Sequence, residues 1–502
     1  MTAVTATTPD AFRPAMHYAA RSTWLNDPNG LIFHEGIYHL YYQNNPEGNV
    51  WGNMSWGHAT STDLVTWVEQ PVAIAYDELE DIYSGSIVFD RYNTSGFGTE
   101  ARPPLVAVYT SAFKPASELS GVQAQSLAYS LDGGYTWTKY AGNPVLNRGS
   151  SEFRDPKVFR FESDAESYWI MVAVEALDFK VVFYSSLDLK KWELLSSFGP
   201  ANATGGVWEC PDLFPLPVDG DPENLKWVLT INLNPGGPNS GSAGQYFVGD
   251  FDGVTFTSSS TVTEGLQAPD RLGDYQWLDW GRDYYAAVSF SDVPDGRRLM
   301  IAWMNNWQYA NEIPTSPWRS PMSLIREVSL QSVDGTPRLV QHVARELASL
   351  PSVHPPFTAD DTEIAEGKHL LDSAAGSVQR IEASLSTGTA EEFGVIVRGE
   401  GTRGTRIGIR PAEGRIVVDR RESGQTGFHE SFASTDAAPI QPTGNSYEVT
   451  IYVDHCSVEV FAQGGQITLS ELIFPASTST DVSVYACGGT ATINSLKVTQ
   501  LA

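Results

Sequence analysis

The sequence predicts an all-β protein in which a five-bladed β-propeller is followed by a C-terminal β-sandwich. Helical periodicity is nearly absent from the 502-residue chain, where short apolar runs are separated by Gly, Pro, Asn and Asp. A strand-and-turn plan recurs through the first two thirds, and apolar and polar residues alternate strictly in the last third. A chain of this length can bury the cores of two domains.

The repeated plan is a strand, an aspartate in a turn, and an aromatic residue four or five positions later. The aromatic residues recur every 55 to 70 residues and are Trp67, Trp137, Trp192 and Phe256. In an all-β chain, a period of this size is typical of propeller blades, where one hairpin per blade carries the same turn and packing residue. We expect a fifth blade without this signature at roughly residues 275–340.

A change in composition divides the chain. All 14 tryptophans lie between Trp24 and Trp318, and the remainder is rich in Thr, Ser, Val and Gly. This change predicts a propeller over residues 12–340, a linker with a short helix over 341–355 and a sandwich over 356–502. In the last part, segments such as "SYEVTIYVDHCSVEVF" alternate as half-buried antiparallel strands do.

The charge balance limits the classes of partner. Lys and Arg total 32 against 60 Asp and Glu, which gives a formal net charge of -28. Such a surface repels phosphate backbones and anionic lipids, so we expect no nucleic acid and no membrane partner, whereas a neutral sugar is compatible with it. No stretch has the length of a transmembrane helix. The cysteines Cys210, Cys456 and Cys487 are too few for a disulfide framework, and no metal or cofactor is predicted.

Three short segments place an acid after an aromatic residue and before a proline. They are "WLNDPNG" (24–30), "FRDP" (153–156) and "WECP" (208–211), with the acids Asp27, Asp155 and Glu209. Asp155 and Glu209 are 54 residues apart, about one blade, and Asp27 lies 128 residues before Asp155. Because the first strand of each blade lines the central channel, we expect the three acids to meet in one axial pocket. The prolines after Asp27 and Asp155 are expected to hold both acids in extended backbone.

Like charges crowded into a partly apolar pocket cannot all be ionised, so the pKa of at least one acid is expected to rise. This allows one carboxylate to act as a nucleophile while another, protonated, donates to a leaving group. Glycoside hydrolysis needs one carboxylate in each of these two roles. The aromatic residues that precede the acids suit the apolar faces of sugars. Each segment alone could be an ordinary turn, but three in phase with the blade repeat favour a catalytic site.

The segments "WLNDPNG", "YSGSIV" (83–88), "FRDPKV" (153–158) and "WECPDLF" (208–214) resemble the signature blocks of glycoside hydrolase family 32, the β-fructosidases. Residues 303–327 resemble most the exo-acting levanase and exo-inulinase branch, and "SVEVF" (457–461) is similar to a strand of the family's C-terminal sandwich. The resemblance covers nearly the whole chain and implies the same two-domain fold. Leu25 and Tyr83 depart from the commoner methionine and phenylalanine.

By this resemblance, Asp27 is the expected nucleophile and Glu209 the expected general acid/base. Asp155 is expected to hold the ring hydroxyls and to stabilise the oxocarbenium-like transition state. Contacts with the terminal fructose are implied for Asn26, Gln43, Trp51, Ser84, Arg154 and Trp318. The guanidinium of Arg154 is expected to keep Asp155 ionised.

Two of these binding assignments stay open on the sequence. Core packing is an equal reading for Trp51, and Trp303 or Trp307 could take the place of Trp318.

We therefore expect a retaining, exo-acting β-fructofuranosidase that releases terminal β-D-fructofuranosyl units from sucrose or fructans through a fructosyl-enzyme intermediate, with some transfer to sugar acceptors. Two alternatives remain: a five-bladed propeller hydrolase of arabinan or xylan, and a homologue that binds glycans without cleaving them. Residues 1–12 show no signal peptide. Polymeric fructan is met outside the cell, so we expect an extracellular protein whose signal has been removed, with a cytoplasmic one as the alternative. Oligomeric state and preference among sucrose, inulin and levan are not predicted.

Overall fold

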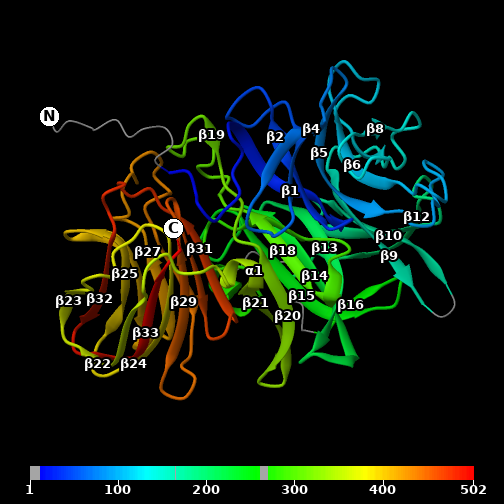
Figure 1. Ribbon diagram of the computed structural model, residues 1–502. Coiled ribbons are helices and arrows are strands. Elements are labelled where there is room, and N and C mark those ends of the chain that lie inside the picture. The colour runs from blue at the N-terminus through cyan, green and yellow to red at the C-terminus, as the bar shows by residue number, and fades with distance from the viewer. Residues whose placement is uncertain (1–11, 164–165, 260–268, 502) are drawn as a thin grey trace.

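The computed structural model describes residues 12–163, 166–259 and 269–501 (Figure 1). Residues 1–11, which fall within the segment predicted to lack a signal peptide, lie outside the described residues. The described part is built almost wholly of strands, with one short α-helix, α1 (Arg345–Ala348). None of the helices in that part is long and apolar enough to cross a membrane.

The N-terminal domain is a five-bladed β-propeller, seen on the right of Figure 1. Each blade is an antiparallel sheet of strands in chain order. The first blade contains β1 (Thr23–His34), β2 (Ile37–Asn45), β3 (Ser55–Ser61) and β4 (Val68–Ile74). The second contains β5 (Glu80–Phe89), β6 (Leu105–Phe113), β7 (Gln123–Ser130) and β8 (Thr138–Lys139). The third contains β9 (Phe153–Glu162), β10 (Ser167–Glu175), β11 (Lys180–Ser186) and β12 (Glu193–Phe198).

The fourth and fifth blades are joined into one sheet by a single parallel pair, Val218 opposite Leu330. Their strands are β13 (Val207–Val218), β14 (Asp221–Asn234), β15 (Ala243–Phe251) and β16 (Phe256–Ser258); then β17 (Tyr285–Ser289), β18 (Arg298–Trp303), β20 (Arg326–Val333) and β21 (Thr336–Val343). The short strand β19 (Trp318–Arg319) pairs in parallel with β1, so a late segment of the propeller completes the first blade.

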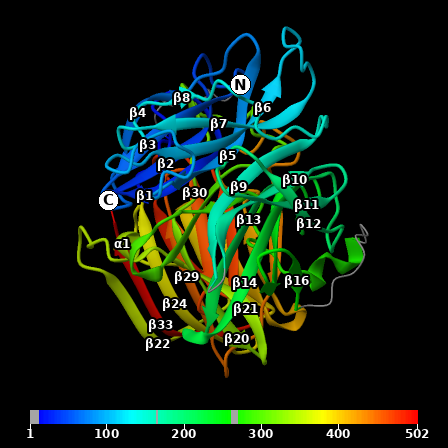
Figure 2. The same ribbon diagram turned by 90° about the vertical axis from the view of Figure 1, so that its right-hand side faces the viewer.

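The innermost strands form a closed ring around the axis. β1 contacts β5, β5 contacts β9, β9 contacts β13, β13 contacts β17, and β17 returns to β1. Figure 2 shows β9 and β13 next to each other in front of the sandwich. The start of each innermost strand is therefore brought to the same end of the axis, as the blade repeat predicts.

The repeated aspartates hold equivalent turns. Each accepts hydrogen bonds from two backbone N–H groups two to four residues later, at 2.7 to 3.2 Å. They are Asp63, Asp132, Asp188 and Asp252. The aromatic residue that follows each one packs against a hydrophobic core of the propeller. The sequence repeat thus reflects one structural device used in four blades.

The C-terminal domain is a sandwich of two six-stranded antiparallel sheets. One sheet contains β22 (Phe357–Ile364), β33 (Ala491–Gln500), β24 (Gln379–Thr387), β29 (Tyr447–Val453), β30 (Ser457–Ala462) and β31 (Ile467–Leu472). The other contains β23 (Gly367–Leu370), β32 (Asp481–Cys487), β25 (Glu392–Glu400), β26 (Arg403–Arg410), β27 (Arg415–Asp419) and β28 (Thr435–Pro439). β21 extends to Val343, three residues beyond residue 340, and α1 leads from it to the sandwich.

Paired charges are buried where the two domains meet. Arg326 in β20 lies 2.6 Å from Glu459 in β30, and both side chains are at most 1% exposed. Arg420 of the sandwich lies 2.6 Å from Asp283 of the propeller, and both are fully buried. Buried ions are tolerated only when they are paired, so these contacts fix the register of the two domains.

Candidate active site

A cavity of about 350 Å³ opens where the innermost strands of the propeller begin. The residues that line it come from the first four blades and from the loop after β18. They are Asn26, Asp27, Gln43, Trp51, Tyr83, Ser84, Gln123, Glu152, Arg154, Asp155, Glu209 and Trp307. All three predicted acids are among them, as are five of the six predicted substrate-binding residues.

A β-bulge interrupts each acid-bearing strand at the cavity. The pairing register shifts between Leu25 and Pro28 in β1, and between Glu209 and Asp212 in β13. The pairing of β9 with β10 shifts across Asp155 in the same way. A bulge adds an unpaired residue and turns its side chain out of the regular alternation. This local departure is what directs the three acids to the axis.

The backbone prediction for Asp155 is wrong. Its φ is +62°, in the left-handed region, although Pro156 was expected to hold it extended. Cys210, at the corresponding bulge of β13, has a φ of +44°. Non-glycine residues adopt this region only where the surrounding structure imposes it. Here the bulge and the hydrogen bonds around it outweigh the local preference set by proline.

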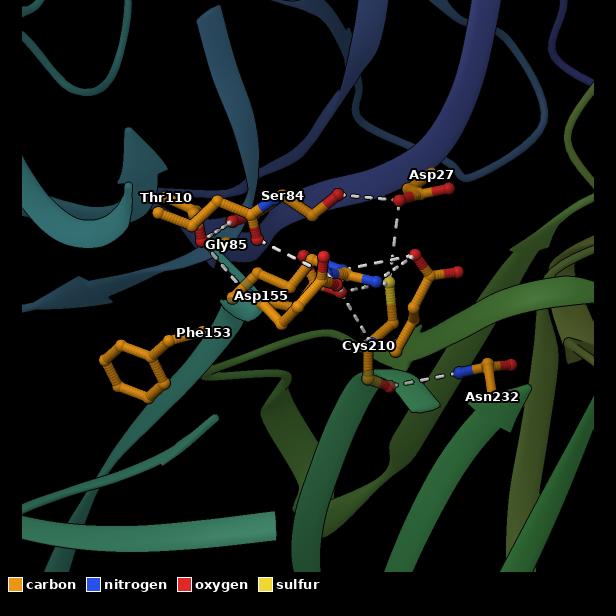
Figure 3. A network of polar contacts seen from close by, with 12 residues as sticks. Asp27, Ser84, Gly85, Thr110, Phe153, Asp155, Cys210 and Asn232 are labelled. Carbon is orange, nitrogen blue, oxygen red and sulfur yellow. Dashed lines mark hydrogen bonds and ion pairs between the residues drawn. The ribbon is translucent and has the colours of Figure 1, made fainter. Parts of the chain in front are cut away.

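Asp27 is held by donors on both carboxylate oxygens, and Figure 3 shows the one from Ser84. Ser84 Oγ donates to Oδ2 at 2.7 Å, and Asn26 Nδ2 donates to Oδ1 at 3.0 Å. Asn26 is itself fixed by a hydrogen bond of 2.7 Å from Trp24 Nε1. Burial raises the pKa of Asp27 and the charge of Glu209 raises it further, while the donors partly offset these effects. The donor geometry orients the carboxylate and favours its charged form.

Asp155 is anchored by the Cys210 backbone of the fourth blade and by the Thr110 side chain of the second blade. Its Oδ2 accepts a hydrogen bond of 2.9 Å from the Cys210 N–H, and its own N–H donates to Thr110 Oγ1 at 3.0 Å. Burial raises the pKa of Asp155 to about 7, against the opposing effect of Arg154 and with the help of the charges of Glu209 and Asp27. The expected rise in pKa is therefore confirmed. Arg154, whose Nε is 3.9 Å from Asp155 Oδ2, lowers the pKa of Asp155 as expected, but burial outweighs its effect.

Arg154 lies closer to Glu209 than to Asp155. Its Nε and Nη2 lie 3.2 and 3.1 Å from Glu209 Oε1. The other oxygen, Oε2, accepts a short hydrogen bond from the hydroxyl of Tyr285, the first residue of β17. Arg154 Nη1 is held in turn by Glu152 at 2.8 Å and Gln123 at 3.3 Å. Both oxygens of Glu209 are therefore oriented by groups from other blades.

Cys210 lies between two of the acids. Its Sγ is 3.5 Å from Asp27 Oδ2 and 3.6 Å from Asp155 Oδ2. Burial raises the pKa of this thiol well above its usual range, and the neighbouring carboxylates raise it further. The neutral thiol can thus donate weakly to either acid. Its sulfur links the two carboxylates, and Cys210 is a free cysteine, as are Cys456 and Cys487.

The predicted sugar-contacting residues divide into walls and core. Trp51 is 44% exposed at the rim and meets Tyr83 edge to face at 6.3 Å between ring centroids, which excludes core packing. Gln43 lines the cavity and donates to the Ile82 carbonyl at 3.0 Å. The assignment of Trp318 must be corrected, because its indole is fully buried in a hydrophobic cluster and does not line the cavity. Trp307 stands at the cavity wall in its place.

Tyr285 and Cys210 are site residues that the sequence reasoning missed. Cys210 follows Glu209 directly, and its place inside a signature block was a usable signal. Tyr285 opens the innermost strand of the fifth blade, so extending the axial argument to all five blades would have pointed to it. Gln123 and Glu152, which line the cavity and hold Arg154, carry no such signal in the sequence.

Comparisons with known proteins agree with this architecture. The model of the glycosyl hydrolases family 32 N-terminal domain matches residues 17–343, and that of the glycosyl hydrolases family 32 C terminal matches residues 350–500. A levanase of Bacillus subtilis (strain 168) is 43% identical over 495 residues, covering 97% of this chain and 70% of the relative. An extracellular exo-inulinase of Aspergillus niger is 42% identical over 505 residues, covering 95% of this chain and 92% of the relative.

Two solved structures extend the comparison to three dimensions. The exo-inulinase from Aspergillus awamori superimposes with a TM-score of 0.91 at 40% identity, covering 98% of both chains. The β-fructofuranosidase from Schwanniomyces occidentalis complexed with fructosyl-erythritol has a TM-score of 0.87 at 30% identity, again over 98% of both chains.

Proposed function

Since the chain belongs to glycosyl hydrolase family 32 and is an exo-acting β-fructosidase of sucrose and fructans, we propose that Asp27, Asp155 and Glu209 carry its reaction in the axial cavity. The observation that supports this most is the convergence of three carboxyl groups from three blades, two of them within 3.6 Å of one sulfur atom. Hydrolysis of a glycosidic bond needs a nucleophile and a proton donor side by side, which such a cluster provides.

In the first step, Asp27 attacks the anomeric carbon of the terminal fructosyl unit. The bond from that carbon to the glycosidic oxygen breaks, and the leaving oxygen takes the proton of Glu209. The product is an ester between Asp27 and the fructosyl unit, with Glu209 left as a carboxylate. Ser84 and Asn26 orient Asp27 for this attack.

In the second step, Glu209 accepts a proton from water as that water attacks the ester. The two inversions give overall retention of configuration and regenerate both acids. Arg154 and Tyr285 hold Glu209 in the position that both transfers require. Asp155 accepts hydrogen bonds from ring hydroxyls and stabilises positive charge as it develops on the sugar. A sugar hydroxyl that replaces water in this step gives transfructosylation.

The aromatic rim determines where the substrate enters. Trp51 and Tyr83 stand on one side of the cavity and Trp307 lines it with them, so flat apolar faces are available to the terminal sugar and to the unit that leaves. We infer that the enzyme works outside the cell, where polymeric fructan is met. Its relatives include exo-inulinases that are named as extracellular.

Product analysis on five substrates tests the proposal. With sucrose we expect equal amounts of glucose and fructose, and with inulin and levan fructose from the first minutes without intermediate oligosaccharides. We expect no release of sugar from arabinan or xylan. Early proton spectra should show the β-anomer of fructofuranose before mutarotation. Oligosaccharides from inulin at the outset would contradict the exo-action, and binding of levan without turnover would favour the glycan-binding alternative.

A further inference from the structure

A second cavity, of about 450 Å³, lies at the opposite end of the propeller axis from the active site. β9 shows the relation: Asp155 is its third residue and borders the active site, whereas Arg160 and Glu162 near its end border the second cavity. We call it the far-face cavity. It is lined by Val88, Phe89, Arg91, Tyr92, Lys157, Val158, Phe159, Arg160, Glu162, Trp169, Leu213, Pro215, Trp227, Ser291, Asp292 and Arg298.

A narrow space of about 10 Å³ lies between the two cavities. Asp155 borders it together with the active site, and Lys157 borders it together with the far-face cavity. Lys157 is neutralised locally, because its Nζ lies 3.2 Å from Asp212 Oδ2, which is fully buried. The far-face cavity is therefore a separate compartment on the propeller axis, closed from the active site by a buried ion pair.

The far-face cavity gathers positive charge that nearby carboxylates compensate only in part. Besides Lys157, three arginines line it, and among the described residues none of them forms an ion pair with a carboxylate: Arg91, Arg160 and Arg298. Glu162 and Asp292 are its only acidic lining residues within that same part of the chain. Asp292 is a charged neighbour of Arg91 and Arg298 but forms no ion pair within 4.0 Å with either, so in a chain with a net charge of -28 these guanidiniums favour an anion in the cavity.

The arginines are fixed in place with donors left over. Arg160 lies over the ring of Trp169 at 5.1 Å and bonds Ser167 through Nε and Nη2, while its Nη1 is buried without an acceptor among the described residues. Arg298 lies over Phe214 at 4.9 Å and donates only to Ser289 Oγ and the Phe290 carbonyl, both at 3.3 Å. Each of these guanidiniums has an aromatic ring beside it, and a guanidinium can form two parallel hydrogen bonds to an oxyanion.

The remaining wall is aromatic. Phe159 and Trp227 face the cavity with their ring centroids 5.7 Å apart, and Tyr92 at its edge is 71% exposed. A ligand with a carbon skeleton as well as charged oxygens would bury that skeleton against these rings. The two acids at the cavity can accept hydrogen bonds from its hydroxyl groups.

We propose that the far-face cavity binds a small organic anion with two or more carboxylate or phosphate groups, held by Arg91, Arg160 and Arg298. The volume suits a ligand of several carbon atoms and not a polymer. The negative charge of the rest of the surface disfavours polyanionic chains such as nucleic acids. The ligand does not enter the active site, because the Lys157–Asp212 pair stands between the cavities.

Calorimetric titration of the full chain tests this proposal with two probes, citrate for the carboxylate source and glycerol 2-phosphate for the phosphate source, each against sodium chloride at equal ionic strength. We expect saturable binding of at least one probe with one site per chain. The double variant Arg91→Gln/Arg160→Gln should weaken that binding by about tenfold or more, since it removes two charged groups that donate hydrogen bonds to the anion. Its turnover of sucrose should stay within about twofold of the parent, because neither residue borders the active site.

A matched variant carries the same loss of charge elsewhere. Arg102→Gln/Arg403→Gln removes two exposed arginines outside the far-face cavity and should leave the affinity within about twofold of the parent. If both double variants bound the probe equally weakly, the loss of affinity would follow from net charge alone, and the proposal would be overturned. The absence of binding by both probes, or binding that Arg91→Gln/Arg160→Gln leaves intact, would also overturn it. If that double variant fails to fold, Arg91→Gln alone, at an exposed residue, decides in the same way.

Discussion

The hydroxyl of Ser84 donates a hydrogen bond of 2.7 Å to Asp27 Oδ2, which joins the second blade to the first at the floor of the active site. The bond works against burial, which raises the pKa of Asp27. A donor to a carboxylate stabilises its charged form, so Ser84 keeps the proposed nucleophile ionised at lower pH than burial alone would allow.

Ser84→Ala should therefore move the acid limb of the pH profile of kcat/KM to higher pH. The sign follows from Asp27: it must be deprotonated to attack, activity is lost as pH falls through its pKa, and removal of the donor raises that pKa. We expect a shift of about one pH unit, because a hydrogen bond to a charged group is worth about 1.5 kcal/mol. Initial rates on sucrose, measured from about pH 3 to about pH 8, would show this shift, because that range spans the pKa values of the acids involved.

Ser86→Ala is the matched control for this shift. Ser86 lies on the same strand, but its hydroxyl bonds the Pro156 carbonyl and the Val158 N–H instead of an acid. An unchanged acid limb in Ser84→Ala, or an equal shift in Ser86→Ala, would show that the contact with Asp27 does not set the limb.

Asp27→Ala and Glu209→Gln should each reduce kcat/KM on sucrose by about 10³-fold or more, since each removes a group that forms or breaks a bond. Neither change should unfold the protein, because most of the fold's buried charge pairs lie elsewhere, at the domain interface. Steady-state rates measured beside circular dichroism spectra separate the two effects. Near-normal turnover in a folded variant would remove the proposed role of that residue.

Tyr285→Phe should lower kcat by about tenfold with a smaller change in KM. The substitution keeps the ring but removes the donor to Glu209 Oε2, so Glu209 loses one of the groups that orient it through both proton transfers. Tyr284→Phe is the control: this neighbouring hydroxyl is buried and has no hydrogen-bond partner among the described residues. Equal losses in the two variants would assign the effect to packing.

Trp307 and Trp318 should respond differently to truncation. Trp307→Ala should raise KM for sucrose by about tenfold, because it removes a wall of the cavity. Trp318→Ala should instead lower the free energy of unfolding by about 3–5 kcal/mol, as large deletions in a core do. Denaturant unfolding and Michaelis constants for both variants check this. A raised KM with unchanged stability in Trp318→Ala would restore the assignment made from the sequence.

The fold could be predicted because its main signals are local. The turn aspartates Asp63, Asp132, Asp188 and Asp252 bond backbone groups within four residues of themselves, so their spacing reports the blades directly. The fifth blade lacks this turn, and only its length and its place after the fourth blade indicated it. The acids could be found for a related reason, since each occupies an equivalent position in an innermost strand.

The remaining details of the site depend on contacts between blades. Tyr285 meets Glu209 across 76 residues of sequence, and Arg154 lies nearer to Glu209, 55 residues away, than to the adjacent Asp155. Trp307 and Trp318 lie in one segment of similar composition. Which of them faces the cavity is decided by the pairing of Trp318 with Thr23, and no local pattern reports that contact.

The domain interface holds a histidine whose ionisation should control stability. His17 Nδ1 lies 2.8 Å from Asp454 and its Nε2 lies 3.0 Å from Glu459, with all three side chains at most 1% exposed. Burial alone would lower the pKa of His17, but the hydrogen bonds and charges of the two acids outweigh it and raise the pKa to about 9 from 6.5. Against the effect of burial, His17 lowers the pKa of Asp454 to about 2, and the charge of Arg326 together with His17 lowers that of Glu459 to about 2.

Stability should therefore fall on both sides of mildly acidic pH. The raised pKa of His17 contributes stability that is fully present below pH 6.5, its unfolded value, and is lost as pH rises through about 9. The lowered pKa values of the two acids contribute stability that is present above 4.5 and is lost as pH falls toward about 2. His17→Gln should lower Tm at about pH 6 and make the decline of Tm toward about pH 9 less steep. The control His354→Gln, at an exposed residue, should change neither the Tm nor its decline. Thermal unfolding at these two pH values measures both effects. An equally steep alkaline decline in His17→Gln would place its origin in another group.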